Sequence, residues 1–453
     1  MGASGRAKIE EKAKQARRAS FKLANVATEE KNKALLRIAD SISANRERIL
    51  AANAQDIEEA EVAVEEGKLS KPLLERLKLD DAKIEEMIRS VRDVAKLDDP
   101  VGKTLSAIEL DNGLELFQVS CPIGVIGAVF ESRPDVLVQI SSLCLKTGNA
   151  VLLKGGSEAH NSNATLFRVV ADAAATAESE IPDGWIQLLE TREDVREMLK
   201  LNEYIDLVVP RGSEQFVKYI QDNTSIMVLG HSEGICHVYV DRDADLDMAL
   251  EICYDAKVQY PAVCNAMETL LVDSAIAQEF LPQMAARYNE AGVEIRGCPE
   301  TLRILGDMDM GEKKGIKPAS DADWRTEYND LIISIRVVNG VDEAIEHINR
   351  YGSGHTDAIV TSNDDTARKF LKFVDSSSVM HNASTRFSDG FRYGKGAEVG
   401  ISTNKVHARG PVGLEGLVIY KYLLLGNGHV VAPYIGRGAR QFTHRRLTKQ
   451  ITL

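Results

Sequence analysis

Short apolar segments alternate with helical segments from residue 121 onward, and this alternation limits the possible folds more than any other feature. Val125–Phe130 is continuously apolar, a helical stretch follows at about 134–146, and Asn149–Lys154 is apolar again. Short apolar runs of this kind are typical of strands buried on both faces, and helices between them indicate parallel pairing. We therefore predict a doubly wound parallel sheet. Its remaining strands are expected at Ile186–Leu189, Ile205–Val209 and Ile226–Leu229.

A second alternating series begins near Ile235. His237–Val240 and Thr269–Val272 are predicted strands, and Ala244–Lys257 between them is a predicted helix. The same alternation continues through 273–289, 330–338, 341–349, 357–361, 364–373 and 377–381. The expected fold class is therefore α/β, with two consecutive doubly wound units that meet near 231–236.

Other segments belong to neither sheet. Residues 5–95 are rich in Ala, Glu, Lys and Leu, with apolar residues three and four apart, which predicts an outer layer of helices. These helices are expected at Lys8–Leu23, Glu29–Asn45 and Arg46–Glu66. Residues 306–327 are polar and contain several helix and strand breakers, so they are predicted to form a surface loop.

Two apolar hairpins are predicted outside the sheets. Residues 106–120 alternate around Asn112-Gly113, a strong hairpin turn signal, and residues 417–431 form a second hairpin around Gly426–Gly428. Exposed apolar edge strands of this kind are unexplained in a monomer. We therefore expect a partner subunit to cover them, in a homo-oligomer of at least two chains.

Composition excludes several classes of protein. At roughly 150 residues per domain, the 453 residues suggest two or three domains. A net charge of −13 is unfavourable for nucleic-acid binding, and no apolar run is long enough to span a membrane. The N-terminus has no apolar signal core, so a cytoplasmic location is expected. The six cysteines include no C-x-x-C pair, which predicts reduced thiols and neither a disulfide framework nor a metal site.

Cys264 has a different setting from the other cysteines. It lies in QYPAVCNAMETLL, after Pro261 and before the polar Asn265, where a loop meets the second α/β unit. A thiol at a turn or at a helix N-terminus is close to backbone N–H donors that lower its pKa, and the thiolate is a nucleophile. The alternative is a small buried hydrophobic residue, as expected for Cys144, Cys236 and Cys253.

Two glycine turns follow neighbouring predicted strands. Lys154-Gly155-Gly156-Ser157 lies between a strand and a helix, and Pro210-Arg211-Gly212-Ser213 repeats the arrangement. Such turns can hold the phosphate or ribose of a dinucleotide. The spacing is not G-x-G-x-x-G, so simple tight turns are the alternative.

A glycine-rich basic segment lies near the end of the chain. Residues 382–413 contain few acidic residues and the cations Arg386, Arg392, Lys395, Lys405 and Arg409. In an acidic chain this concentration of cations indicates an anionic ligand, although a solvated loop is the alternative.

Several strings together resemble one known family. They are CPIGVIGAVFESRPDV, LKGGSEA, YIDLVVPRGS, QYPAVCNAMETLL, RYGSGHTDAIVT, NASTRFSDGFRYGKGAEVGIST and HARGPVGLEGL. They resemble the gamma-glutamyl phosphate reductases, also called glutamate-5-semialdehyde dehydrogenases, of the aldehyde dehydrogenase superfamily. The chain is also similar to the C-terminal half of bifunctional pyrroline-5-carboxylate synthases. The resemblance implies NADPH-dependent reduction of L-glutamate 5-phosphate to glutamate 5-semialdehyde and phosphate, the second step of proline biosynthesis.

The resemblance also implies roles for individual residues. Cys264 matches the nucleophile, and Lys154 matches the lysine that contacts the adenosine ribose or its 2′-phosphate. The other cofactor-binding positions implied are Ser157, Gly212, Ser213 and Glu327, of which Glu327 would hold the nicotinamide ribose.

Domain roles follow from the same resemblance. Residues 1–105 and 121–234 would bind NADPH, and 235–410 would form the catalytic domain. Residues 106–120 and 411–435 would form an oligomerisation flap, and 436–453 a C-terminal tail. Functional coupling to glutamate 5-kinase is expected, and the start at Met1 favours a free-standing chain over a fusion.

The chain departs from the wider superfamily in two places. Hydrolytic aldehyde dehydrogenases carry a glutamate base where this chain has Val228, and such a base would waste a thioester intermediate by hydrolysis. The usual oxyanion asparagine is absent from the Glu-Ser-Arg-Pro string at 131–134. The backbone N–H of Cys264 and the side chain of Asn265 are the candidate donors.

The substrate carries a phosphate, a carboxylate and an ammonium group. Arg386 or Arg392 would bind phosphate or carboxylate, and Ser384 and Thr385 would donate to the same oxygens. Glu131 or Asp389 would bind the ammonium, and Arg133 is a further expected substrate-binding residue. Two other functions stay open: a hydrolytic aldehyde dehydrogenase, and a non-catalytic assembly module that works through the hairpins.

Overall fold

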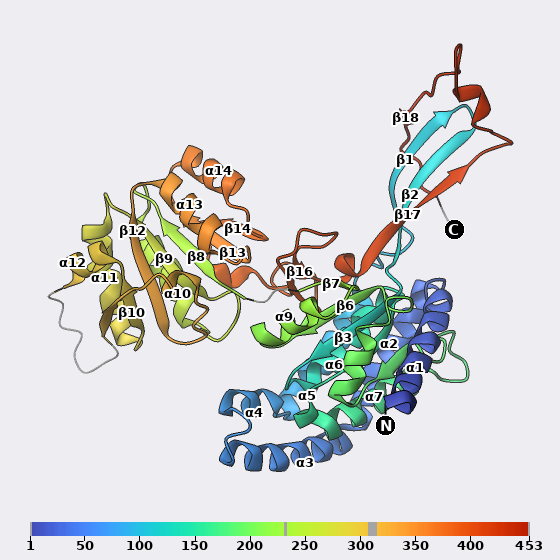
Figure 1. Ribbon diagram of the computed structural model, residues 1–453, viewed down its shortest axis with the longest axis horizontal. Coiled ribbons are helices and arrows are strands. Elements are labelled where there is room, and N and C mark those ends of the chain that lie inside the picture. The colour runs from blue at the N-terminus through green and yellow to red at the C-terminus, as the bar shows by residue number, and fades with distance from the viewer. Residues whose placement is uncertain (1, 231–232, 307–314, 452–453) are drawn as a thin grey trace.

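The computed structural model describes residues 2–230, 233–306 and 315–451 (Figure 1). Two α/β units lie side by side along the long axis, and a narrow β-sheet projects away from both. The predicted meeting point near 231–236 falls partly on residues 231–232, which lie outside the described residues.

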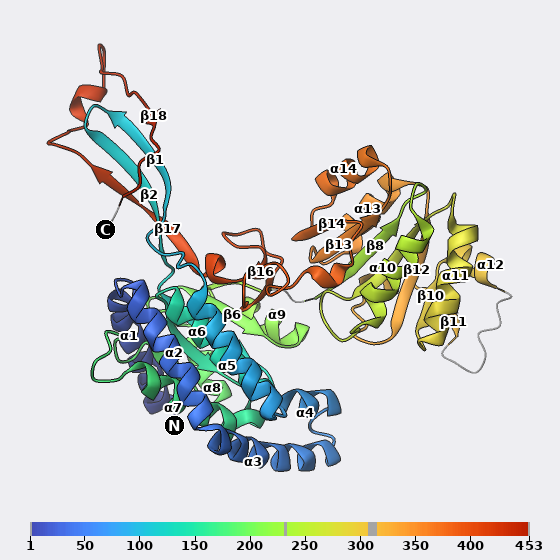
Figure 2. The ribbon, with the colours of Figure 1, turned by 180° about the vertical axis from the view of Figure 1, so that it is seen from behind.

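The first unit is built on a parallel sheet with the strand order β5-β4-β3-β6-β7. Its strands are β3 (Val125–Phe130), β4 (Ala150–Lys154), β5 (Ile186–Leu188), β6 (Leu207–Arg211) and β7 (Met227–Val228). Every residue of β3 and β4 is buried, as their continuous apolar sequences predict. Figure 2 shows α1, α2 and α5 over this unit from behind. Its helices are α1 (Gly2–Leu23), α2 (Thr28–Ala44), α3 (Arg46–Glu65), α4 (Lys71–Leu77), α5 (Asp81–Lys96), α6 (Pro134–Lys146), α7 (His160–Ala174), α8 (Arg192–Met198) and α9 (Glu214–Asp222).

The second unit has a parallel sheet in the order β11-β10-β12-β9-β8-β13-β14. The strands are β8 (Cys236–Val240), β9 (Met267–Asp273), β10 (Glu294–Gly297), β11 (Ile316–Pro318), β12 (Ile332–Val338), β13 (Thr356–Val360) and β14 (Ser378–His381). The helices are α10 (Leu246–Val258), α11 (Ala277–Glu290), α12 (Pro299–Leu305), α13 (Val341–Tyr351) and α14 (Asp364–Phe373). The predicted pair of doubly wound units is confirmed.

The expected loop at 306–327 is wrong in part. Its described residues include β11 at the sheet edge and a short 3-10 helix, Asp323–Arg325. β11 is only three residues long, so it carries too little pattern to be recognised as a strand. Residues 307–314 lie outside the described residues.

The projecting sheet, the flap, has the strand order β17-β2-β1-β18. β1 (Thr104–Asp111) and β2 (Leu114–Pro122) form the predicted hairpin around Asn112-Gly113. The predicted second hairpin is wrong. β17 (Val418–Leu425) pairs along its length with β2, and β18 (Arg445–Arg446) pairs with β1. The glycines at 426 and 428 mark a turn into irregular chain, because an apolar strand and a turn signal do not specify the pairing partner.

The segment from Ala397 to Leu417 returns to the first unit after the second sheet is complete. Ala397, Val399, Val412, Leu414 and Leu417 are buried in the main core of the first unit. The range 235–410 expected for the catalytic domain therefore includes residues that pack with the other unit. None of the described helices is long and apolar enough to cross a membrane.

Candidate active site

Cys264 lies in a turn between α10 and β9, at the amino end of a strand. Its side chain is half-buried, and the thiol forms no disulfide. The turn is closed by a hydrogen bond from the Ala266 N–H to the Val263 carbonyl, 2.9 Å. The sequence left a turn and a helix N-terminus open for Cys264, and the structure has the turn.

Contacts from β8 and from the residues just before it fix the turn that carries Cys264. A Cβ at Gly234 would lie 2.1 Å from the Cys264 carbonyl oxygen, so only glycine fits there. The buried Cys236 thiol donates to the same carbonyl at 3.2 Å, and its sulfur lies 3.6 Å from His355 Nδ1. Cys236 therefore supports the backbone of Cys264.

Asn265 is buried beside Cys264. Its Nδ2 donates to the Ser388 carbonyl at 2.8 Å, while its Oδ1 has no partner among the described residues. The backbone N–H of Cys264 donates no hydrogen bond to any described residue. Of the two expected oxyanion donors, the backbone N–H is the uncommitted one.

Two arginines lie close enough to Cys264 for their charges to interact with its sulfur. Arg386 is 8% exposed and its Nε donates to Gln259 at 3.0 Å. Removal from water lowers the pKa of Arg386, against the opposing effect of several negative groups, including the Cys264 thiolate. Arg211, at the end of β6, is affected in the same way. Burial lowers its pKa, and nearby negative groups, including Cys264, oppose this with a smaller effect. Sequence reasoning missed Arg211, although it lies inside the Pro210-Arg211-Gly212-Ser213 string.

Hydrogen bonds among neighbouring residues hold the segment around Arg386 in place. Thr385 is fully buried and its Oγ1 has no partner among the described residues. Ser384 is buried and accepts from the Arg386 N–H at 3.3 Å. Arg392 is exposed and donates to the Arg386 carbonyl at 3.0 Å, 3.8 Å from Asp389. Of the expected cations, Arg386 therefore lies near Cys264. Arg392 instead supports the backbone of Arg386 through its hydrogen bond to the Arg386 carbonyl.

The expected cofactor residues of the first unit meet at the carboxyl ends of β3, β4 and β6. Lys154 ends β4 and is 6% exposed, and burial lowers its pKa. Ser157 begins the 3-10 helix Ser157–Ala159. Gly212 and Ser213 lie exposed before α9. Carboxyl ends of parallel strands are the usual ligand-binding edge of a doubly wound sheet.

Glu131 contacts the turn formed by Gly212 and Ser213. Its Oε2 accepts from the Ser213 N–H at 2.9 Å, and a Cβ at Gly212 would lie 2.5 Å from the same oxygen. The next residue, Ser132, is fully buried with φ of +42° and donates through its N–H to Glu158 at 2.7 Å. A non-glycine residue in this region is strained, and such strain concentrates at functional sites. The structure therefore places Glu131 beside the expected cofactor residues.

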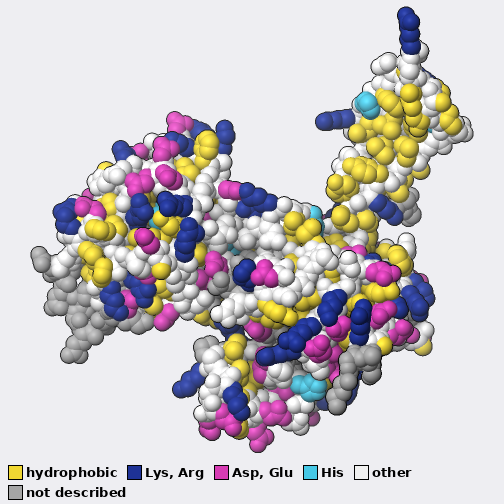
Figure 3. Space-filling model, viewed as in Figure 1, with side chains coloured by type: hydrophobic (Ala, Val, Ile, Leu, Met, Phe, Trp, Pro, Cys, Tyr) yellow, Lys and Arg dark blue, Asp and Glu magenta, His cyan; other side chains and the backbone are white. Residues whose placement is uncertain are grey.

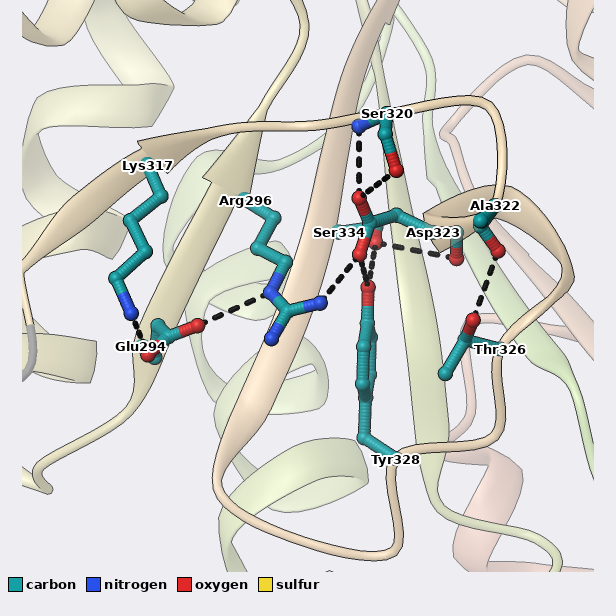
Figure 4. A network of polar contacts seen from close by, with 9 residues as sticks. All are labelled: Glu294, Arg296, Lys317, Ser320, Ala322, Asp323, Thr326, Tyr328 and Ser334. Atoms are coloured by element: carbon teal, nitrogen blue, oxygen red, sulfur yellow. Dashed lines mark hydrogen bonds and ion pairs between the residues drawn. The ribbon is translucent and has the colours of Figure 1, made fainter.

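Glu327 lies in the second unit, on the segment between β11 and β12. Figure 4 shows the network that holds this segment. Asp323 accepts from Tyr328 at 2.8 Å and from Arg296 at 2.5 Å, and Arg296 also donates to Glu294 at 3.0 Å. Although burial opposes it, these hydrogen bonds hold the pKa of Asp323 well below its usual range.

A buried ion pair anchors the same segment from the other side. Lys257 on α10 and Glu268 on β9 are fully buried and 2.6 Å apart. Glu268 also accepts from the Asn329 N–H at 3.3 Å, and Asn329 has φ of +53°. Burial raises the pKa of Glu268 to about 7, against the effect of Lys257.

Arg133 lies on the wall of a cavity of about 480 Å³ that both units line. The other walls come from α4, α5 and the first turns of α6, and from Tyr260 and Ala262 of the second unit. Ala262 is two residues before Cys264. Among the described residues there is no group of three or more metal-ligating side chains that could hold a metal ion.

Comparison with known proteins decides the family. The family model described as the aldehyde dehydrogenase family matches residues 1–296. The gamma-glutamyl phosphate reductase of Methanococcoides burtonii is 58% identical over 447 residues, covering 98% of each chain. The protein of the same name from Acetivibrio thermocellus is 54% identical over 445 residues, covering 98% of this chain and 100% of that one. The chain belongs to the gamma-glutamyl phosphate reductase family.

Solved structures agree with this assignment. The crystal structure of the gamma-glutamyl phosphate reductase of Thermotoga maritima is 44% identical and matches with a TM-score of 0.88, covering 93% of this chain and 99% of that one. A glyceraldehyde-3-phosphate dehydrogenase from Methanocaldococcus jannaschii, complexed with NADP, is 17% identical with a TM-score of 0.65, covering 93% and 95%. This second match shows the fold alone. The predicted aldehyde dehydrogenase fold is confirmed, as is the enzyme class, an oxidoreductase of this family.

Proposed function

We propose that this gamma-glutamyl phosphate reductase family member reduces L-glutamate 5-phosphate to L-glutamate 5-semialdehyde with NADPH, releasing phosphate. The reaction is the second step of proline biosynthesis and passes through a thioester on Cys264. The observation that carries the proposal is a half-buried thiol under the charges of Arg211 and Arg386, in a chain 58% identical to a protein of that name.

The first unit fits a nicotinamide dinucleotide at the turns after β4 and β6. A Cβ at Gly155 would lie 2.1 Å from Asn163, and one at Gly212 would meet Glu131 and Phe216. Packing against these side chains therefore leaves room only for glycine at both turns, and glycine turns after parallel strands are a common form of phosphate-binding site. Lys154, Ser157, Gly212 and Ser213 would hold the adenosine and phosphate parts, with Lys154 favouring the 2′-phosphate of NADPH, and Glu327 would hold the nicotinamide ribose.

Cys264 and its neighbours carry the chemistry in the proposed mechanism. The thiolate attacks the 5-carbonyl carbon, a C–S bond forms, the bond to the phosphate oxygen breaks, and phosphate leaves. Arg386 and the unpartnered Thr385 hydroxyl bind the phosphate, and Ser384 keeps the Arg386 backbone in place. The uncommitted N–H of Cys264 donates to the oxyanion. A nicotinamide held by these residues would supply hydride for the thioester carbon, after which the C–S bond to Cys264 breaks, the aldehyde leaves and the thiolate is regenerated.

Val228 stands where hydrolytic aldehyde dehydrogenases carry a glutamate base, and its side chain cannot take up a proton. Val228 is buried in β7 among apolar side chains, and its carbonyl accepts from Asn404 at 2.8 Å. The thioester is therefore protected from hydrolysis, which favours transfer to phosphate in the reverse direction.

The reverse reaction tests this proposal, because the acyl phosphate is unstable. Pyrroline-5-carboxylate and NADP⁺ are mixed with enzyme, with and without phosphate, and NADPH absorbance is followed. We expect NADPH formation only with phosphate. Equal rates without phosphate would support the alternative of a hydrolytic aldehyde dehydrogenase.

The flap supports a further proposal, that a second copy of this chain covers it. Figure 3 shows apolar side chains gathered over its surface. On β17, the exposed apolar side chains include Tyr420, Tyr422, Leu424 and Leu425, which are 49%, 60%, 57% and 47% exposed. Apolar edge strands of this length are normally covered. We expect sedimentation to give at least a dimer, and Tyr422→Lys with Leu424→Lys to give monomers. Coupling to glutamate 5-kinase and the cytoplasmic location stay predictions.

A further inference from the structure

The cavity of about 480 Å³ between the two units extends the site beyond the phosphate end of the substrate. Its walls include α4 and α5, elements to which sequence reasoning gave no role other than a helical layer. Ala262 places one wall two residues from Cys264, and the buried Met87 and Val138 give the cavity an apolar part.

Four charged side chains around this cavity are unpaired. They are Arg76 on α4, Glu86 on α5, and Arg133 and Asp135 at the start of α6. None of the four forms a hydrogen bond or an ion pair with any described residue. Their neighbours differ: Glu75 pairs with Lys78, and Lys83 donates to the Lys78 carbonyl.

Two unpaired charges of each sign around one cavity match a zwitterion. An arginine guanidinium binds a carboxylate with two parallel hydrogen bonds, and a carboxylate accepts from an ammonium group. Glu131 and Asp389 are the acids expected to bind the ammonium, and both are already engaged, Glu131 by the Ser213 N–H and Asp389 by the N–H groups of Phe391 and Arg392. The cavity therefore offers free groups for charges that the Cys264 and Arg386 region does not complement.

We propose that this cavity binds the amino-acid end of the substrate. Arg76 and Arg133 bind the α-carboxylate, Glu86 and Asp135 bind the α-ammonium, and Met87 and Val138 contact the methylene chain. The inference rests on the proposed function, because it places the 5-carbonyl at Cys264. It makes these four residues determinants of specificity for a zwitterionic aldehyde or acyl phosphate.

Three aldehydes separate the two pairs of charges. They are pyrroline-5-carboxylate, which opens to the full substrate, 5-oxopentanoate, which lacks the ammonium, and butanal, which lacks both charges. Each is oxidised with NADP⁺ and phosphate by the wild type and by Arg76→Gln, Arg133→Gln, Glu86→Gln and Asp135→Asn. Glu85→Gln is the matched control, since Glu85 neighbours Glu86 on α5 but pairs with Arg46 outside the cavity.

The expected result is a crossing pattern in kcat/KM. The arginine variants lose at least about tenfold with pyrroline-5-carboxylate and with 5-oxopentanoate. The acid variants lose about tenfold with pyrroline-5-carboxylate only. All variants keep wild-type activity with butanal, and the control matches the wild type throughout.

Two results would overturn the proposal in different ways. An active wild type whose cavity variants lose nothing, or lose equally with every aldehyde, contradicts the inference and leaves the proposed function intact. A wild type that is inactive with pyrroline-5-carboxylate contradicts the proposed function and the inference together.

Discussion

The candidate functional residues lie at opposite strand ends in the two parallel sheets. The carboxyl ends of the first sheet are called the first edge, and the amino ends of the second sheet are called the second edge. In the first sheet, the residues expected to bind the cofactor follow the carboxyl ends of β3, β4 and β6, and include Glu131, Lys154 and Ser213. In the second sheet, Cys264 precedes the amino end of β9, and its support comes from Cys236 at the amino end of β8. The two sheets share one architecture, yet the residues proposed for the two tasks lie at opposite ends of their strands.

The two edges also differ in the residues that form them. The first edge is made of glycine turns, of which Gly212 and Ser213 are exposed, and such turns suit a ligand that binds reversibly. The second edge is held by buried pairs such as Lys257–Glu268 and His237–Asp357, at 2.6 and 2.8 Å. At the carboxyl ends of the second sheet, Tyr239 and Arg242 donate to Asp273, which closes the usual ligand edge. The comparison teaches that the turns expected to bind the cofactor are shaped by glycines, whereas the turn that carries Cys264 is positioned by buried side chains.

The largest effect should come from the nucleophile. Cys264→Ala should lower phosphate-dependent turnover by more than about 10⁴-fold, because the thioester cannot form. NADPH affinity, measured by fluorescence titration, should be unchanged, since Cys264 is not among the residues proposed to hold the cofactor. Cys121→Ala, a half-buried thiol in the flap, is the matched control. Residual turnover within tenfold of the wild type would show that Cys264 is not the nucleophile.

The buried pair should dominate the stability of the second edge. Lys257→Met leaves Glu268 buried without its partner, and we expect a loss of about 3–5 kcal/mol in the free energy of unfolding. The double variant Lys257→Met, Glu268→Leu should recover most of it, because neither charge stays buried alone. Lys33→Met removes the exposed pair with Glu30 and should cost under about 0.5 kcal/mol in the same urea titration. Equal losses from both pairs would break the contrast between the edges.

His347 should make the second unit sensitive to acid. Burial, with a smaller effect from His237, lowers the pKa of His347 to about 2. Below an unfolded pKa near 6.5 the unfolded chain therefore binds a proton that the folded chain does not, so stability falls as the pH falls. His347→Phe should remove a slope of about 1.4 kcal/mol per pH unit between about pH 6 and 4. Urea unfolding across this range measures it, and an unchanged slope would contradict the assignment.

Gly212→Ala should affect the first edge alone. The added Cβ would lie 2.5 Å from Glu131 and 2.8 Å from Phe216, so the turn must shift. We expect the KM for NADP⁺ to rise about tenfold, or about 1.4 kcal/mol, with kcat within about twofold. Gly297→Ala, which crowds Thr301 in the second sheet, should leave this KM unchanged. A fall in kcat with a constant KM would place Gly212 in the chemistry of the second edge.

Sequence patterns predicted the local parts of this fold. Continuous apolar runs located β3 and β4, and Asn112-Gly113 located the β1–β2 turn, because each depends on neighbouring residues. The pairing of β17 with β2 joins positions about 300 residues apart, and no local pattern encodes such a partner. For the same reason, the return of Val399 and Val412 to the first core was not predicted.

For the candidate site, too, the sequence pointed to residues within recognisable strings and missed those brought in by packing. The family strings led to Cys264, Lys154 and Arg386, which lie on the elements expected of them. Glu131 was assigned to the substrate because a sequence lists an acid without showing which N–H it accepts from. Arg76 and Glu86 carry no motif, and only the packing of α4 and α5 beside Tyr260 brings them to the cavity.

The central claim is that Cys264 forms a thioester that only phosphate resolves. Enzyme is mixed rapidly with pyrroline-5-carboxylate and NADP⁺ without phosphate, NADPH is followed, and the protein is then digested for mass spectrometry. The account predicts a burst of about one NADPH per chain, a glutamyl adduct on the Cys264 peptide, and turnover only after phosphate is added. Steady turnover without phosphate, or a burst with no adduct on Cys264, would contradict it.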